Sequence, residues 1–251
     1  MQVKRIGSSW LGLLTGAVWA GVTLPAWGSP PSTPTSSTAA DRARTAALVP
    51  VEVLPPHVRE GARLAVEKAT LFSHGPAESF SCDPAVYYWF LDHPDRAVTA
   101  WRRLGAKCLS ISDRGNGRFG WADEAGSDVV WETVYRAPNL RIWYAEGKVK
   151  PGVLLPTVPI RAVVVLRHAE GRGQNGGALI HHQADMFLRT DSTAAALATK
   201  LFGASAPRLA EQCLSQLEMF FAGLAWYVHQ HPERANVILT GDAGQQRPTG
   251  N

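Results

Sequence analysis

Two histidines at matching positions of neighbouring strand-like segments are the residues of this chain best suited to chemistry. The segments Ile160 to Ala169 and Ala178 to Thr190 alternate in polarity and flank the glycine-rich stretch GRGQNGG, which predicts an antiparallel hairpin centred near Asn175. This register places His168 opposite His182 on one face of the hairpin. Such a pair can contact a ligand's polar group, act as acid and base, or bind a metal, and it can equally be structural.

A metal site would need a third and a fourth ligand, which the sequence does not identify. Glu146 is a candidate partner on the same face, although it lies near a strand end, where a solvated role is equally consistent. We therefore predict no metal and no cofactor, and we name His168 and His182 only as candidates for acid and base.

The alternation assigns faces to the third hairpin. With the centre near Asn175, one predicted set faces inward and the other outward. The inward set pairs Ala162, Val164, Leu166 and His168 with Leu188, Met186, Ala184 and His182. The outward set is Arg161, Arg167, Asp185 and Arg189.

A second hairpin is predicted from Asp128 to Ala137 and Leu140 to Lys148, around Pro138-Asn139. The same reasoning predicts one inner face and one outer face. The inner face comprises Val129, Trp131, Thr133, Tyr135, Leu140, Ile142, Tyr144 and Glu146. The outer face comprises Asp128, Glu132, Arg136 and Arg141.

The elements before these hairpins complete a recognisable order. Lys107 to Asp113 and Arg118 to Asp123 flank the turn Gly115-Asn116-Gly117, which brings the number of consecutive antiparallel strands to about six. Thr70 to Cys82 is expected to be extended, with a bend at Gly75-Pro76. Helices are predicted in the segments His57 to Lys68, Pro84 to Asp92 (capped by Asp83) and Pro94 to Gly105, the last two separated at His93-Pro94.

The strongest helical signal runs from Pro207 to His231. Apolar residues recur there at spacings of three and four, and flanking residues widen the stripe well beyond a narrow seam. A helix of this kind needs an extended apolar surface, and the predicted sheet provides one.

The order of one strand, two short helices, six antiparallel strands and a long helix resembles the START-like, or helix-grip, superfamily (SRPBCC). This superfamily includes Bet v 1-like allergens, lipid-transfer domains and polyketide cyclases. The resemblance covers about Lys68 to His231 and rests on Asp83-Pro84, the aromatic run AVYYWF, the turn DRGNGRFG and the terminal helix. It implies an α+β fold in which a curved sheet wraps around the last helix, with a cavity for a hydrophobic ligand between them.

Aromatic and apolar side chains would line such a cavity. Large rings form an apolar wall, while tyrosine hydroxyls and imidazoles orient a ligand's polar end. The predicted ligand-binding residues are Trp131, Tyr135, Tyr144, His168, His182, Phe220, Leu224 and Tyr227. Ordinary core packing without a cavity is the alternative for the same residues.

Three functions follow from this reasoning. The first is a binding or transfer protein for a lipid, isoprenoid or aromatic molecule. We expect this function, and therefore binding, in preference to catalysis. The second is a cyclase, hydratase or hydrolase that uses His168 and His182. The third is a ligand-free interaction module on a stalk, with a filled core and a large apolar surface patch.

Composition and motifs exclude several other functions. The chain of 251 residues has a formal net charge of only +4, and no basic run is interleaved with aromatics, so we expect no nucleic-acid partner. The motifs GxSxG, HExxH and CxxC do not occur in it. Cys82, Cys108 and Cys213 are odd in number and form no disulfide framework, although one pair can still bridge.

The first residues have the character of a targeting segment. Lys4 and Arg5 precede an uncharged apolar stretch, 6–24, and Ala26-Trp27-Gly28 offers a cleavage point. We expect a signal peptide at 1–28 and a secreted or periplasmic protein, with a membrane anchor at 6–24 as the alternative. A Pro/Ser/Thr-rich linker is predicted at 29–56, the folded domain at 57–231 and a flexible tail at 232–251.

Overall fold

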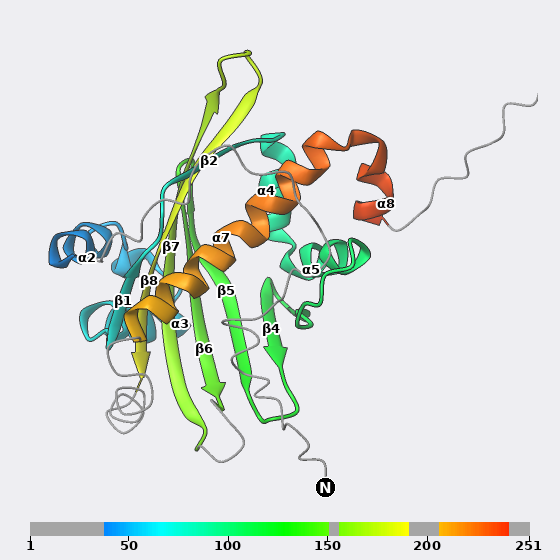
Figure 1. Ribbon diagram of the computed structural model, residues 1–251. Coiled ribbons are helices and arrows are strands. Elements are labelled where there is room, and N and C mark those ends of the chain that lie inside the picture. Colours follow the sequence, from blue (N-terminus) through cyan, green and yellow to red (C-terminus); the bar gives the residue numbers. More distant parts are fainter. Residues whose placement is uncertain (1–37, 151–155, 191–205, 241–251) are drawn as a thin grey trace, which may run out of the picture.

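One antiparallel sheet organises the computed structural model, which describes residues 38–150, 156–190 and 206–240. The sheet has eight strands in the order β1-β8-β7-β6-β5-β4-β3, with β2 also paired to β8 (Figure 1). The strands are β1 (Leu71–His74), β2 (Glu78–Ser81), β3 (Ser112–Gly115), β4 (Arg118–Ala122), β5 (Asp128–Ala137), β6 (Leu140–Val149), β7 (Val158–Arg172) and β8 (Ala178–Thr190).

The last six strands form the predicted meander, in which each strand pairs with the next along the chain. The predicted extended segment before them is also present, and it is divided into β1 and β2 at the expected bend, Gly75-Pro76. One strand is shorter than predicted. Residues 107–111 lie outside β3, and the Arg102 guanidinium donates to the Cys108 carbonyl oxygen at 2.8 Å, which holds this segment beside the preceding helix.

The four predicted helices begin within one residue of the expected positions, and α4 shows a local reason for this. The Asp83 carboxylate accepts from the Ala85 N–H at 2.9 Å, and Pro84 is the first helical residue after this N-cap. The described helices are α2 (Ala39–Ala46), η1 (Val51–Val53), α3 (Pro56–Glu67), α4 (Pro84–Asp92), α5 (Pro94–Arg103), α7 (Ala206–Gln230), η3 (Pro232–Arg234) and α8 (Ala235–Thr240). After α5, Gly105 has a φ of 88°, a conformation that glycine adopts at low cost.

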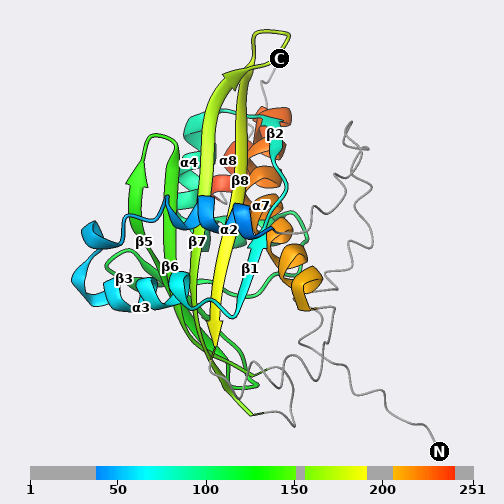
Figure 2. The ribbon, with the colours of Figure 1, turned by 90° about the vertical axis from the view of Figure 1, so that its left-hand side faces the viewer.

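Both faces of the sheet are covered. Helix α7 crosses one face, with α4 and α5 beside it, whereas α3 packs on the opposite face against β7 and β8 (Figures 1 and 2). Leu166, Ala184 and Leu224 belong to the core under α7, and Val163 and Phe187 belong to the core under α3. The sequence pattern predicts a polar outer face, so the second core is a correction.

The second hairpin contains a β-bulge, and its faces differ from those predicted. Near the turn the register is as predicted, with Tyr135 opposite Ile142, but Val134 is an extra residue on β5 and Trp131 lies opposite Ala145. A shift of one residue exchanges the two faces of a strand. The bulge therefore separates Trp131 from the face that Tyr135 shares with Ile142. The side of the sheet on which Ile142 and Tyr144 lie is set by the pairing of β6 with β7, where they lie opposite Val165 and Val163. Trp131 stays on the α7 side, whereas Leu140, Ile142, Tyr144 and Tyr135 belong to or pack against the core under α3.

The third hairpin has the predicted register along its whole length. His168 lies opposite His182, Leu166 opposite Ala184 and Ala162 opposite Leu188. The predicted outward residues Arg167 and Asp185 lie on the α3 side, where they form an ion pair at 2.7 Å.

The folded part extends beyond the predicted domain limits at both ends. The predicted linker, 29–56, includes α2 and η1, and Leu54 within it is fully buried. The predicted tail, 232–251, includes η3 and α8, where Ile238 is buried. The predicted targeting segment, 1–28, lies outside the described residues. Among the described helices, none combines the length and the apolar composition needed to cross a membrane.

Candidate functional site

The two predicted histidines lie side by side under α4, and each contacts one of two consecutive tyrosines. The Tyr87 hydroxyl lies 2.9 Å from His182 Nδ1, and the Tyr88 hydroxyl lies 3.4 Å from His168 Nδ1. Both imidazoles are buried, with exposed fractions of 3% for His182 and 7% for His168. The cap at Asp83 sets where α4 begins and thereby aims this tyrosine pair at the sheet.

The partners of His182 define its hydrogen-bonding state. Its Nε2 lies 3.4 Å from the carboxylate of Glu78, which is its cross-strand neighbour on β2. Because a carboxylate only accepts, Nε2 carries a proton in this arrangement, and in the neutral imidazole Nδ1 then accepts from the Tyr87 hydroxyl. His182 is therefore held in one orientation from two sides.

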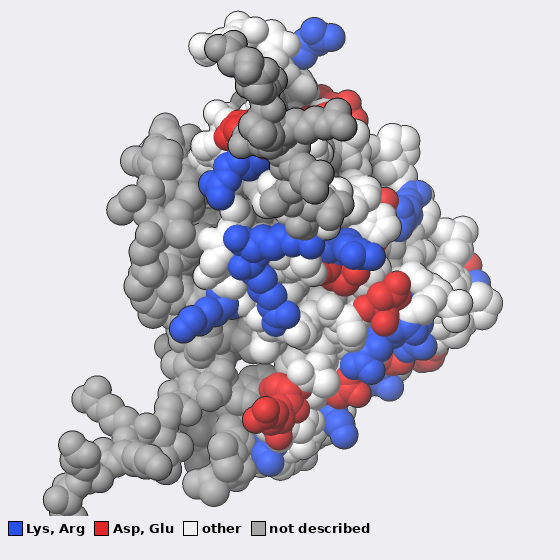
Figure 3. Space-filling view, turned by 90° about the vertical axis from the view of Figure 1, so that its right-hand side faces the viewer, with Lys and Arg blue, Asp and Glu red and all other residues white. Residues whose placement is uncertain are grey.

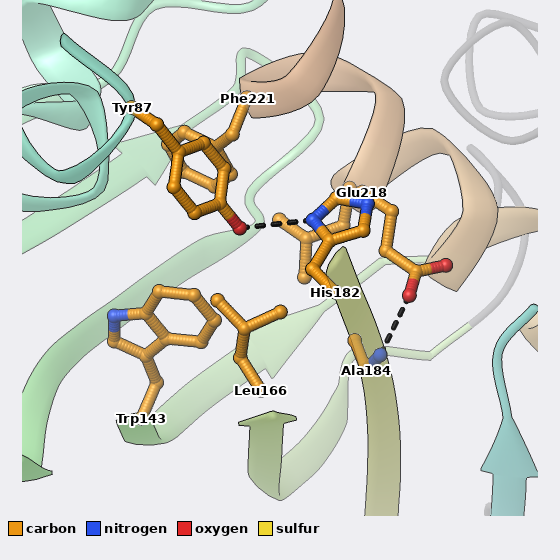
Figure 4. A pocket seen from close by; sticks show the side chains of 8 residues that line it. Tyr87, Trp143, Leu166, His182, Ala184, Glu218 and Phe221 are labelled. Carbon is orange, nitrogen blue, oxygen red and sulfur yellow. Dashed lines mark hydrogen bonds between the residues drawn. The ribbon is translucent and has the colours of Figure 1, made fainter. Parts of the chain in front are cut away.

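A small, partly open cavity adjoins His182 between the sheet and α7 (Figure 4). Its volume is about 10 Å³, which is close to the space that one water molecule needs. Aromatic and aliphatic side chains form most of its wall, together with three polar residues. The lining residues are Tyr87, Trp143, Leu166, His182, Ala184, Leu217, Glu218 and Phe221.

Glu218 was not predicted as a site residue, and neither was any other residue that lines the cavity except His182. Glu218 lies on α7 with an exposed fraction of 2%. Its Oε1 accepts from the Ala184 N–H at 2.6 Å, and its Oε2 is buried without a hydrogen-bond partner. A signal for it exists in the sequence, because Glu218 lies four residues after Leu214 and three before Phe221, on the apolar stripe itself.

Burial shifts the protonation of this region toward neutral forms. It raises the pKa of Glu218 to about 9, assisted by the nearby charges of Glu78 and Asp185 and opposed by the Ala184 N–H. Burial, with Arg141 and His182 nearby, lowers the pKa of His168 to about 4. Burial likewise raises the pKa of Tyr87 well above its ordinary value. At neutral pH, Glu218 is therefore a carboxylic acid and His168 a neutral imidazole.

The structure distributes the predicted ligand-binding residues over different places. Of these eight residues, all within the described ranges, only His182 lines the small cavity. Trp131, Phe220, Leu224 and Tyr227 belong to or pack against the core under α7, while Tyr144 and Tyr135 lie in or against the core under α3. The Tyr144 hydroxyl donates to Glu146 at 2.9 Å, so Glu146 is not a partner of the histidines.

The cysteines offer no activated nucleophile in the described part of the chain. Cys82 and Cys108 are free thiols, and the side chain of Cys213 lies outside the described residues. Burial raises the pKa of Cys82 to about 12 and also raises that of Cys108. Cys108 borders a wide, open depression of about 510 Å³ beside α5, whose lining includes Arg102, Asp123 and Glu124.

Within the described ranges, no group of three or more His, Cys, Asp or Glu residues could hold a metal ion.

Charges of both signs are distributed over the face shown in Figure 3. A band of Lys and Arg crosses its middle, and clusters of Asp and Glu lie below it and beside it. On this face, the acidic clusters adjoin the basic band.

Comparison with known proteins gives structural similarities only. No protein-family description matches the chain, and no curated protein matches its sequence. Among solved structures, a conserved protein from Geobacillus kaustophilus is 13% identical with a TM-score of 0.39, covering 61% of this chain and 94% of that one. A hypothetical protein from Helicobacter pylori is 11% identical with a TM-score of 0.36, covering 64% of this chain and 89% of that one.

A di-domain ARO/CYC protein, BexL from the BE-7585A biosynthetic pathway, is 18% identical with a TM-score of 0.36. The match covers 66% of this chain and 52% of BexL, so this chain spans about half of the di-domain protein. The helix-grip arrangement itself follows from the strand order and from α7 crossing the sheet, as described above.

Proposed function

We propose that this protein binds a hydrophobic small molecule between α7 and the sheet, with the polar end of the molecule near His182 and Tyr87. The supporting observation is the composition of the cavity wall. The rings of Trp143 and Phe221 line it together with an imidazole, a phenol and a carboxylic acid. Buried polar groups in an apolar wall orient a ligand that the wall would otherwise bind without direction.

Binding would require the cavity to widen, because about 10 Å³ does not hold an organic molecule. Leu217, Glu218 and Phe221 form the α7 side of the cavity. A movement of α7 away from the sheet would shift these three side chains together. Met219, the neighbour of Glu218, is 46% exposed, so the side of α7 that carries Met219 already meets solvent.

Ligand recovery tests the proposal directly. The full chain is purified, extracted with organic solvent and analysed by mass spectrometry, and uptake of a fluorescent fatty acid is measured in parallel. Leu217→Trp fills the cavity, whereas Met219→Trp adds the same ring on the exposed side of α7. We expect a compound in the wild type and in Met219→Trp, and at least about tenfold less in Leu217→Trp.

Recovery of no compound from the wild type, together with no probe uptake, would contradict the proposal. A filled-core interaction module would then be the better interpretation. Equal recovery from Leu217→Trp and Met219→Trp would place the ligand outside this cavity.

Catalysis in the same cavity is the second candidate, and the fixed orientation of His182 favours it. His182 is held between Tyr87 and Glu78, as a general base or acid would be. His168 does not line the cavity, so His182 is the candidate of the two. If a recovered compound is converted by the protein, His182→Gln is expected to bind it but to lower kcat by about 100-fold or more.

A further inference from the structure

The sheet is interrupted at one edge, directly beside the cavity. Strand β1 ends with His74 opposite Asp185, and β2 begins with Glu78 opposite His182. Two residues of β8, Gln183 and Ala184, therefore lie opposite the bend that joins β1 and β2. Because the bend contains Pro76, which has no N–H, a regular ladder cannot continue through it.

Side chains take the place of the missing ladder bonds. The Gln183 amide donates to the Gly75 carbonyl oxygen at 2.8 Å, and the Ala184 N–H donates to Glu218 Oε1 at 2.6 Å. The Gly75 N–H still donates to the Ala184 carbonyl oxygen at 2.8 Å. Thus one of the two substitutes comes from the sheet itself, and the other comes from α7.

The carboxyl group of Glu218 is pressed directly onto this interruption. A Cβ atom at Gly75 would lie 2.8 Å from Glu218 Oε2 and 2.7 Å from the Ala184 carbonyl oxygen. Oε2 is buried and has no partner. The same residue therefore makes a short bond through one oxygen and leaves the other unsatisfied, so the contact is tight and incompletely compensated.

We propose that Glu218 is a latch that holds α7 on the interrupted edge, and that its release lets α7 move and opens the cavity. The last step rests on the proposed function, while the latch itself does not. Glu218 is suited to this role because it joins the α7 side of the cavity wall to a backbone amide that lacks a strand partner.

The surroundings of Glu218 make the latch sensitive to alkaline pH. Glu78 on β2, Tyr87 on α4 and His182 on β8 lie on the same side of the sheet as Glu218, and the charges of Asp185 on β8 and Arg167 on β7 act on it from the opposite face. Burial raises the pKa of Glu218 to about 9, so the acid is neutral at neutral pH. Ionisation would place a buried negative charge near Glu78 and Asp185, with Arg167 as the opposing charge, and would favour release into water.

Amide hydrogen exchange of the full chain tests the latch without any ligand. Glu218→Leu removes the acceptor, Glu218→Gln keeps an acceptor oxygen but cannot ionise, and Glu211→Leu on the same helix is the control. We expect the protection factor of the Ala184 amide to fall by about tenfold or more in Glu218→Leu and to stay within about threefold of wild type in the other two variants.

The pH dependence gives a second readout. From about pH 7 to about pH 10, protection of Ala184 is expected to fall in the wild type and to stay level in Glu218→Gln. Unchanged protection in Glu218→Leu, or equal pH dependence in wild type and Glu218→Gln, would overturn the latch. If Glu218→Leu does not fold, the comparison with Glu218→Gln still decides. Failure to recover a ligand would contradict the proposed function and leave the latch unaffected.

Discussion

Gly75 lies where the surrounding atoms leave no room for a side chain larger than a hydrogen. Its Cα lies against the Ala184 carbonyl oxygen and the carboxyl group of Glu218, and its backbone is bonded on both sides to β8. Neither neighbour is free to retreat, because one is backbone and the other is bonded to the Ala184 N–H.

We therefore predict that Gly75→Ala destabilises the protein by about 1–3 kcal/mol, the typical cost of overpacking. The measurement is urea unfolding at neutral pH. Gly173→Ala is the matched control, because a Cβ there would meet the side-chain oxygen of Asn175 at 3.1 Å and the Gly177 carbonyl oxygen at an ordinary 3.8 Å. Equal stability of the two variants would show that the edge at Gly75 can yield.

The histidine pair illustrates a different residue-level point. His168 and His182 are neighbours because of strand register, but their hydrogen-bond partners come from α4, which supplies a tyrosine to each. Two consecutive tyrosines on a helix cannot point in the same direction. His168 lies on β7 and His182 lies opposite it on β8, so each of the two diverging tyrosines reaches a different histidine.

At the level of elements, helix α2 is attached to the sheet by a buried carboxylate. Asp185 on β8 is fully buried and accepts from Thr45 of α2 at 2.5 Å and from Arg167 at 2.7 Å, while His74 Nδ1 lies 2.6 Å away. A buried charge is tolerated when several donors surround it. Through this cluster the segment before α3 becomes part of the domain.

Replacing Thr45 with Val removes one donor while keeping nearly the same shape. We expect a loss of about 1–3 kcal/mol in the free energy of unfolding, as for a hydrogen bond to a charged group. Thr99→Val serves as the control, because the Thr99 hydroxyl donates only to the Asp95 carbonyl oxygen within its own helix. A loss no larger than that of the control would mean that α2 is held by apolar contacts alone.

At the scale of the whole molecule, two buried groups make stability depend on pH in opposite directions. For His168 the pKa in the folded protein is about 4, below the ordinary value of 6.5, so the unfolded chain binds more protons between these values. Stability therefore rises with pH over that range. For Glu218 the folded pKa of about 9 lies above the ordinary value of 4.5, and stability falls as pH rises between them.

Single variants separate these two contributions. We expect the difference in unfolding free energy between wild type and His168→Gln to increase by about 1–3 kcal/mol from pH 4 to pH 6.5. The corresponding difference for Glu218→Gln should decrease from pH 4.5 to pH 9. Denaturant titrations at stepped pH values provide both curves. If the curves of wild type and one variant were parallel, the residue replaced in that variant would not contribute to the pH dependence of stability.

The sequence by itself determined the features that depend on neighbouring residues. The cap at Asp83, the break at His93-Pro94, the bend at Gly75-Pro76 and the register that pairs His168 with His182 all follow from local patterns. The order of elements, and with it the helix-grip fold, follows from these features in turn. Helix α2 was predictable in the same way, because Thr38 and Asp41 form a capping box.

Only the tertiary structure decided which faces are buried and what meets across them. The bulge at Val134 placed Trp131 on the opposite side of the sheet from Tyr135 and Tyr144, and no local signal in β5 marks its position. The continuous apolar run from Ala162 to Leu166 is consistent with a strand covered on both faces, but it does not identify α3 as the cover. Glu218 meets Ala184 across 34 residues, and Thr45 meets Asp185 across 140. Contacts at such separations depend on how complete elements pack, which periodicity and capping cannot express.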